Sequence, residues 1–313
     1  MNTKNRNIIL PILMTILIVT GMVAAADIFD NKEIIFPEIA AIAAGGLVAP
    51  KLAWNTDKKR ILFFITVCAV LGVGIVRYVP GPVWMQMVSA YLLSQLICLC
   101  SGTTFAPMIS AMVLPVMLQT ETVIYIICAV LFTTLILFFR FLLEQTGATP
   151  AVLYTRGRLP GSSDFLHALI RTGLSAAVIF PALTLNAKFA VAPPLLVAFT
   201  EFSNPASGAR KKPVKSVVLI GVSALIGASF RYVLSMSLFA LPLCITAALT
   251  ILAVLLLMER LSMFIPPAGA VSILAMLIPE QAVLWFPVQI TIGAFIVMTM
   301  AILFFKKECP ENC

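Results

Sequence analysis

Long apolar runs separated by short polar clusters dominate the chain. Runs of about twenty residues, such as 8–26 and 122–141, are long enough to cross the roughly 30 Å hydrocarbon core of a bilayer as helices. The first run also has features of a secretory signal peptide, because it follows Lys4 and Arg6 and ends in three alanines. We interpret it as a membrane helix, since a similar internal run occurs at 165–184. The pattern predicts an all-α, polytopic integral membrane protein.

The same order of segments occurs twice along the chain. Arg77-Tyr78-Val79 returns as Arg231-Tyr232-Val233, and Pro107 aligns with Pro267. We expect two tandem repeats of about six membrane segments, over 1–143 and 164–307, joined by a polar linker at 144–163 and followed by a short tail at 308–313. The predicted segments are 8–26, 36–54, 61–79, 83–100, 107–118 and 122–141, then 165–184, 189–202, 217–233, 238–258, 266–278 and 283–305.

Two predicted segments are too short to span a bilayer and begin with proline. They start at Pro107 and at Pro266-Pro267, and each gives only about 20 Å of helix. Proline suits a first helical turn because it has no amide hydrogen and a fixed φ. A helix that starts inside the bilayer presents free amide donors and a partial positive charge. Broken helices at matching places in two halves indicate the binding site of a transporter.

The candidate site residues follow from these helix starts, nearby hydroxyl groups and rare ionisable side chains. For substrate binding they are Thr103, Thr104, Pro107, Ser110, Pro266, Pro267, Gly269 and Ser272. As vestibule or coupling groups they are Glu38, Arg77, Glu201 and Arg231. Structural roles are the alternative: small residues allow helices to pack closely, and an arginine beside a tyrosine suits the membrane interface. His167 and Arg171 are four residues apart, so they share one helical face.

Composition narrows the class of protein. Apolar residues make up 61% of the chain and charged ones 11%, with a formal net charge of +8. The basic residues gather in short loops, as in cytoplasmic loops of membrane proteins, so we expect no nucleic-acid partner. Loops 51–60 and 204–215 each carry four basic residues. They should lie on one side, which predicts repeats that run in the same direction, in the cell membrane with both termini cytoplasmic. Re-entrant segments at Pro107 and Pro266, with inverted repeats, are the alternative topology.

Signatures of enzymes and of metal sites do not occur in the sequence. It has no glycine-rich phosphate loop with its lysine, no GxSxG elbow and no HExxH motif. The seven cysteines are scattered and there is one histidine, so the spacing favours no metal site. We therefore expect neither an enzyme nor a cofactor.

One motif carries a resemblance to a known family. The run Ile265-Pro266-Pro267-Ala268-Gly269-Ala270, which follows Asn204-Pro205 and the basic Arg210-Lys211-Lys212, resembles the His-Pro-Pro-Ala-Gly-Ala signature of the HPP family of integral membrane proteins. The resemblance covers 187–305, and more weakly 36–142. Ile265 replaces the signature histidine, so no role of that imidazole carries over. Plant members of the family are described as plastid nitrite transporters, so the resemblance implies transport of small anions.

These observations predict a membrane transport protein for a small solute. A small inorganic anion similar to nitrite is favoured, because helix starts and hydroxyl groups bind anions. The path would use alternating access or a channel-like route. An exporter of small organic or aromatic acids is one alternative, and a scaffold or partner subunit that transports nothing is another. The expected partners are the lipid bilayer and the solute, and a homo-oligomer is compatible with the sequence.

Overall fold

The computed structural model describes residues 8–150, 154–157 and 160–305, and in these residues the chain is helical and contains no strand. The predicted tail at 308–313 and both chain ends lie outside the described residues. The helices are α1 (Ile9–Ile28), α2 (Glu38–Ala43) continued by the π-helical turn η3 (Ala44–Val48), α3 (Lys58–Tyr78), α4 (Val83–Ser101), α5 (Pro107–Leu118), α6 (Val123–Gln145), α7 (Ser162–Thr184), α8 (Pro193–Ser203), α9 (Pro213–Phe230) continued by η5 (Arg231–Ser237), α10 (Leu243–Arg260), α11 (Pro266–Leu277) and α12 (Phe286–Phe304). Short 3₁₀ turns connect some of them: η2 (Lys32–Ile34), η4 (Lys188–Val191) and η6 (Glu280–Ala282).

Long helices form the outside of the molecule. Eight helices of the described part are long and apolar enough to cross a membrane: α1, α3, α4, α6, α7, α9 with η5, α10 and α12. Only 28% to 44% of each apolar stretch is buried inside the protein. The exposed remainder carries large apolar side chains, including Leu17, Phe63, Phe138 and Phe295. A surface of this kind is disfavoured in water and suits contact with lipid. The fold is therefore that of a helical, multi-pass membrane protein.

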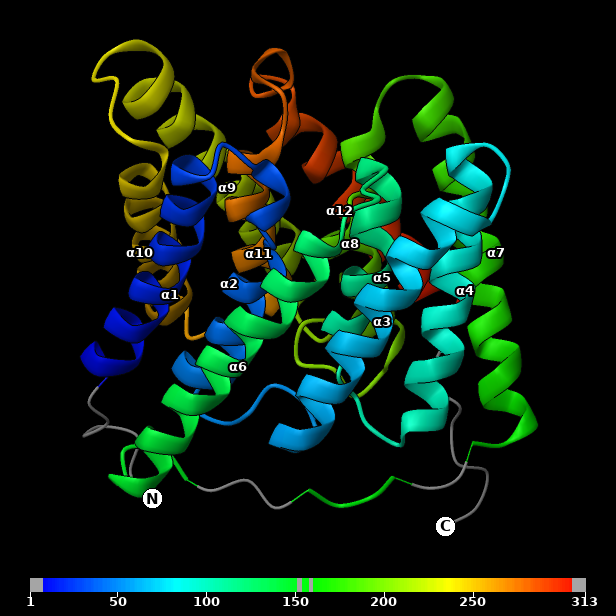
Figure 1. Ribbon diagram of the computed structural model, residues 1–313. Helices are drawn as coiled ribbons and strands as arrows, with labels where there is room; N and C mark the ends of the chain where they lie inside the picture. The colour runs from blue at the N-terminus through cyan, green and yellow to red at the C-terminus, as the bar shows by residue number, and fades with distance from the viewer. Residues whose placement is uncertain (1–7, 151–153, 158–159, 306–313) are drawn as a thin grey trace.

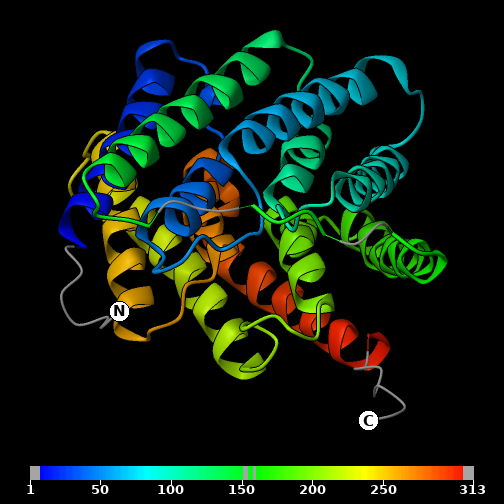
Figure 2. The ribbon, with the colours of Figure 1, turned by 90° about the horizontal axis from the view of Figure 1, so that it is seen from below.

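Short helices occupy the centre of the molecule, surrounded by the long ones (Figure 2). We call α2 with η3, α5, α8 and α11 the inner helices. Every residue of α11 is buried, and so is every residue of α5 except Leu118. A helix that is apolar on all sides can be buried on all sides. The inner helices pack in pairs, α2 against α11 and α5 against α8.

Proline begins each inner helix, and each start is buried. Pro107, Pro193 and Pro266 are the first helical residues of α5, α8 and α11, and α2 begins directly after Pro37. The residues directly before these prolines are also buried, namely Phe36, Ala106, Ala192 and Ile265. The sequence pattern indicated such starts only at Pro107 and Pro266. It predicted a longer helix over 36–54, which in the structure ends at Val48, before the turn at Pro50.

The connections between helices divide between two faces of the molecule (Figure 1). One face, here the linker face, holds the described residues 154–157 of the connection between α6 and α7 together with loops 49–57, 102–106, 204–212 and 261–265. Hydrogen bonds join these loops to the linker. Asn55 donates through Nδ2 to the carbonyl of Thr155 at 2.7 Å, and Tyr154 donates to the carbonyl of Gly102 at 3.0 Å. Each inner helix runs toward or away from this face, as the long helices do.

Glycines let two long helices approach the inner helices closely. A Cβ at Gly72 of α3 would overlap the carbonyl oxygen of Met112 in α5. A Cβ at Gly227 of α9 would likewise overlap the carbonyl oxygen of Ser272 in α11. Small residues at such crossings allow backbones to pack closely in membranes, where the hydrophobic effect does not drive helices together.

Gly72→Ala should destabilise the protein by about 1–3 kcal/mol, because α3 and α5 must move apart to admit the methyl group. The check is the fraction of detergent-solubilised protein that stays folded after heating. Gly74→Ala is the matched control, since it lies on the same helix with open space around it. Equal losses of stability in both variants would show that the contact with Met112 is not the cause.

Candidate functional site

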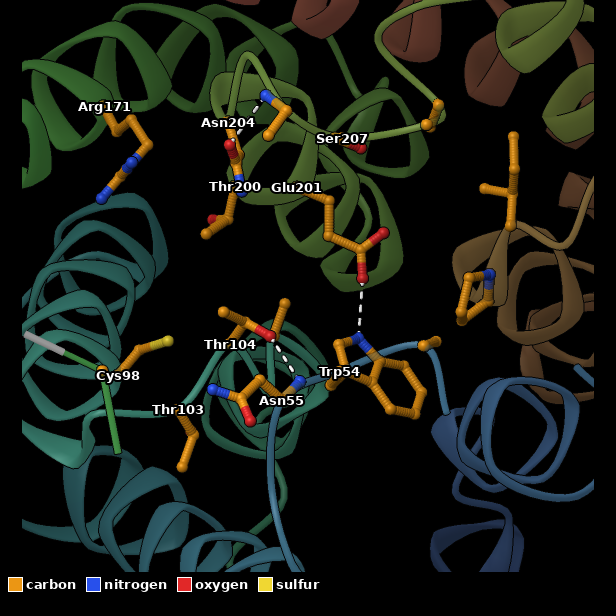
Figure 3. A pocket seen from close by; sticks show the side chains of 18 of the residues that line it. Trp54, Asn55, Cys98, Thr103, Thr104, Arg171, Thr200, Glu201, Asn204 and Ser207 are labelled. Atoms are coloured by element: carbon orange, nitrogen blue, oxygen red, sulfur yellow. Dashed lines mark hydrogen bonds between the residues drawn. The ribbon is translucent and has the colours of Figure 1, made fainter. Parts of the chain in front are cut away.

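A cavity of about 1050 Å³ lies at the linker face. Its walls come from the ends of α4 and α8, the first half of α7, the starts of α5 and α11, and the loops between them (Figure 3). Ala106, directly before α5, and Pro266, the first residue of α11, both line it. The cavity is thus the place where two of the proline-led inner helices begin.

Hydroxyl and amide groups line one side of the cavity. Thr103 and Thr104 lie in the short loop between α4 and α5. The backbone amide of Asn55 donates to Thr104 Oγ1 at 2.8 Å, so the loop after η3 is held against the loop before α5 (Figure 3). Residues separated by about fifty positions in the chain therefore form one polar wall.

A second polar cluster forms between α4 and α8. Gln95 donates through Nε2 to Thr200 Oγ1 at 2.6 Å, and the hydroxyl of Tyr91 lies 3.0 Å from the same oxygen. Thr200 in turn donates to the carbonyl of Leu196 at 3.1 Å. Gln95 and Thr200 both line the cavity. The network fixes their orientation, because each group has a defined partner.

The charged groups of the cavity are unequal in number. The basic side chains of its lining are Arg171, Lys211 and Lys212, and the acidic ones are Asp164 and Glu201. With the histidine neutral, three positive charges face two negative ones. A cleft with an excess of one sign raises the local concentration of the opposite ion.

Glu201 and Arg171 differ in how they are held. Glu201, on α8, accepts a hydrogen bond from Trp54 Nε1 through Oε1 at 3.0 Å (Figure 3). Arg171, on α7, has no hydrogen bond or ion pair among the described residues, and its Nε is buried. Its closest aromatic contact is Phe305, whose ring centre is 5.8 Å from the guanidinium carbon. The positive charge of Arg171 is therefore available to a bound anion.

The predicted substrate residues divide between the cavity wall and the interior. Thr103, Thr104 and Pro266 line the cavity. The others are buried deeper in α5 and α11 and do not line it: Pro107, Ser110, Pro267, Gly269 and Ser272. The hydroxyl of Ser272 donates to the carbonyl of Gly269 at 2.8 Å, so it is engaged within its own helix. The structure thus brings three of the eight predicted substrate residues together in the cavity and leaves the other five in the interior.

The predicted coupling residues also lie in different places. Glu201 is in the cavity, whereas Glu38 is buried at the start of α2. Arg77 and Arg231 lie at the face opposite the linker, at the ends of α3 and α9. Arg77 does not pair with Glu38, because its Nε donates to the carbonyl of Glu121 at 2.7 Å. The four residues therefore do not form one vestibule.

Arg231 instead closes the carboxyl end of α11. Arg231 as a whole residue is 4% exposed, and its guanidinium donates to the carbonyls of Ala275 and Ile278 at 2.5 and 2.6 Å. Carbonyls at the end of a helix lack partners within the helix and carry a partial negative charge. An arginine satisfies both needs, and Arg77 does the same for the loop that follows α5.

Two further arginines, which the sequence pattern did not single out, serve α2 and α8. Arg140 of α6 donates to the carbonyl of Gly46 in η3 and to Glu144 Oε1 at 2.9 Å. Arg210 donates to the carbonyls of Phe202 and Ser203, at 3.1 and 3.3 Å. Burial lowers the pKa of the Arg210 guanidinium, although an arginine stays charged in proteins. Each inner helix therefore has an arginine at or just beyond its carboxyl end.

Sequence patterns missed most of the cavity lining. Gln95 and Thr200 lie within apolar runs, and a polar side chain inside a membrane segment is a usable signal. Trp54 and Asn55 gave no sequence signal of a place in the cavity wall, because that place depends on contacts with residues far along the chain. In the described residues, no three histidine, cysteine, aspartate or glutamate side chains gather as metal ligands.

Comparison of the chain with protein-family models, with curated proteins and with solved structures finds no match. Function is therefore argued from the geometry of the cavity.

Arg231→Gln should lower stability by about 1–3 kcal/mol for each buried carbonyl left without a partner. Thermal unfolding of the purified protein in detergent measures the loss. Arg260→Gln is the control, since Arg260 is exposed and makes no hydrogen bond through its side chain among the described residues. If both variants unfold at the same temperature, Arg231 does not hold the end of α11.

Ser207→Cys should react with a water-soluble thiol reagent, because Ser207 lines the cavity, whereas Ser272→Cys should stay unmodified in the folded protein. Both variants are made in a chain whose native cysteines are replaced, and mass spectrometry measures the modified fraction. Rapid modification of Ser272→Cys would mean that the cavity extends along α11, as the sequence analysis predicted.

Proposed function

We propose that the chain is a membrane transport protein for a small anionic solute, and that the cavity at the linker face is its solute site. The observation that carries the proposal is the unpaired guanidinium of Arg171 in a cavity that also holds Lys211 and Lys212. An anion there would gain charge-assisted hydrogen bonds from Arg171 and neutral ones from the threonine hydroxyls.

Alternating access is the mechanism we propose. The cavity stops where the inner helices pack against one another: Gly269 of α11 lies so close to α2 that a Cβ there would be 3.2 Å from the carbonyl oxygen of Ala40. The structure would then represent the state open to the linker face. Rocking of one half of the molecule against the other would close the cavity and open a path to the opposite face.

We infer that the two halves are repeats with the same direction. Eight long helices would cross the membrane, and each of the four inner helices, together with its flanking loops, would lead the chain from one face to the other. The packing of α3 on α5 has a counterpart in α9 on α11, each with a glycine at the crossing. The contact of α1 with α10 has a counterpart in that of α7 with α4. Loops 49–57 and 204–212 both contribute to the cavity, so both basic loops lie at one face. By the positive-inside rule that face is cytoplasmic, in the cell membrane. Membership of the HPP family stays a proposal that rests on the resemblance of residues 265–270 to the family signature.

The size of the cavity supports a second class of solute. Its volume of about 1050 Å³ is far larger than an inorganic anion needs, and pockets of about 300–1,000 Å³ hold drug-sized ligands. Trp54 and Phe264 are aromatic residues of the lining. Small organic acids therefore remain the second candidate substrates.

Flux into proteoliposomes tests the proposal. The panel contains nitrite, nitrate, formate, acetate and benzoate, each with the intact chain, with Arg171→Gln and with the double variant Lys211→Gln/Lys212→Gln. Losing one charged hydrogen bond costs about 1.5 kcal/mol or more, so Arg171→Gln should weaken apparent affinity about tenfold. The control is Arg260→Gln, an exposed arginine that does not line the cavity. Protein-free vesicles give the background rate.

Preference for benzoate over nitrite would select the organic acids. Flux equal to the background for every anion would contradict transport and favour a scaffold or partner subunit. Equal flux with the intact chain and Arg171→Gln would remove the cavity from the path.

A further inference from the structure

Glu38 is a carboxyl group without a partner in the interior of the protein. It is the first residue of α2 and is 1% exposed, and neither of its carboxyl oxygens has a hydrogen-bond partner among the described residues. Ser110, in the first turns of α5, adjoins it and is also fully buried. The Ser110 hydroxyl likewise forms no hydrogen bond that meets ordinary geometry. A carboxyl and a hydroxyl therefore lie side by side in an apolar interior.

No cation faces this carboxyl from the helices around it. α5, α11 and η3 carry no ionisable side chain. On α6 the facing titratable group is Tyr125, whose hydroxyl donates to the carbonyl of Ala111 at 3.0 Å. Arg140 of α6 lies at the other end of α2, where it donates to Gly46, and Asp27 of α1 is exposed.

An ionised carboxylate in such a place would lack a counter-ion, and the side-chain donor beside it among the described residues is the neutral hydroxyl of Ser110. Burying an isolated charge is far more costly than burying the neutral acid, so the group binds a proton instead. We propose that Glu38 is a proton-binding site of this protein and that its proton couples to movement of the solute. The coupling rests on the proposed function, whereas proton binding does not.

The geometry gives the proton a short route to the cavity. Ala106 lines the cavity, and Ser110 follows it by one helical turn, about 6 Å along α5. Ser110 is buried in this structure, so a movement of α5 must first let water reach it from the cavity side. Its hydroxyl can then accept a proton from that water and donate one to the carboxylate. Glu38 would give the proton up when α2, α5 and α11 move apart toward the opposite face. No bond other than those to the proton forms or breaks.

Infrared spectroscopy of the purified protein tests proton binding directly. The intact chain should show the carbonyl-stretch band of a protonated carboxylic acid at neutral pH, and Glu38→Gln should lose the part of its intensity that one carboxyl group contributes. Glu38→Gln should also unfold at the same temperature as the intact chain, because a neutral amide replaces a neutral acid of the same shape. Absence of the band, or a band of unchanged intensity in Glu38→Gln, overturns the proposal whether or not the protein transports anything.

Flux measurements test the coupling. With the intact chain, an inward proton gradient should drive accumulation of the anion that the flux panel selects. Glu38→Gln should lose this accumulation but keep exchange of labelled for unlabelled solute. Glu259→Gln is the control, an acid at the end of α10 that does not line the cavity. Proton-driven accumulation that survives in Glu38→Gln, or that follows a sodium gradient instead, overturns the coupling. If no anion moves with the intact chain, the proposed function fails and the infrared band alone decides proton binding.

Discussion

The inner helices depend on arginines that bind their free carbonyl groups. A helix that ends inside an apolar protein leaves carbonyls without partners, and each would cost about 1–3 kcal/mol if left unsatisfied. The guanidinium of arginine suits this position, since it is planar, always charged and offers five donors. Arg231 alone binds two carbonyls, that of Ala275 in the last turn of α11 and that of Ile278 directly after the helix. At the other end, proline removes an amide donor that would also need a partner. Together the two residue types allow a helix of eleven or twelve residues to exist wholly inside the protein.

The short length of the inner helices also produces the cavity. The long helices extend to both faces, but α5 and α11 begin inside the protein, so loops and side chains line the space below them at the linker face. The arginines at the carboxyl ends of the inner helices and the cavity at the amino ends of α5 and α11 both follow from the short length of these helices. The cavity is polar where loops meet and apolar where Ile265 and Pro266 begin α11.

Much of the fold follows from the hydrophobic pattern, because a run of twenty apolar residues has few alternatives to a membrane helix. The proline-led starts at Pro107 and Pro266 were also recognisable. Those at Pro37 and Pro193 were not recognised as buried helix starts, because Pro37 directly follows the predicted segment start at Phe36 and Pro193 lies within the predicted segment 189–202. The site was harder to predict. Trp54 and Glu201 form a hydrogen bond across 147 positions of sequence, and no local pattern encodes such a contact. The arginines were assigned to anion attraction or to the interface because the sequence does not show which carbonyls lack partners.

Glu38 breaks the similarity of the two halves. Under the proposed repeat its place in the second half falls at Pro193 and Pro194, and that of Ser110 falls at Ala270. Neither proline nor alanine can bind a proton, so only one half carries the buried acid. The solute cavity, in contrast, draws on both halves, through Thr103 and Thr104 from the first and Arg171 and Glu201 from the second. The helix α5 connects the two sites. The residue before its first turn lines the solute cavity, and Ser110 in its first turns adjoins Glu38. Movement of this single inner helix would therefore change the surroundings of both sites together, which is the structural requirement for coupling them.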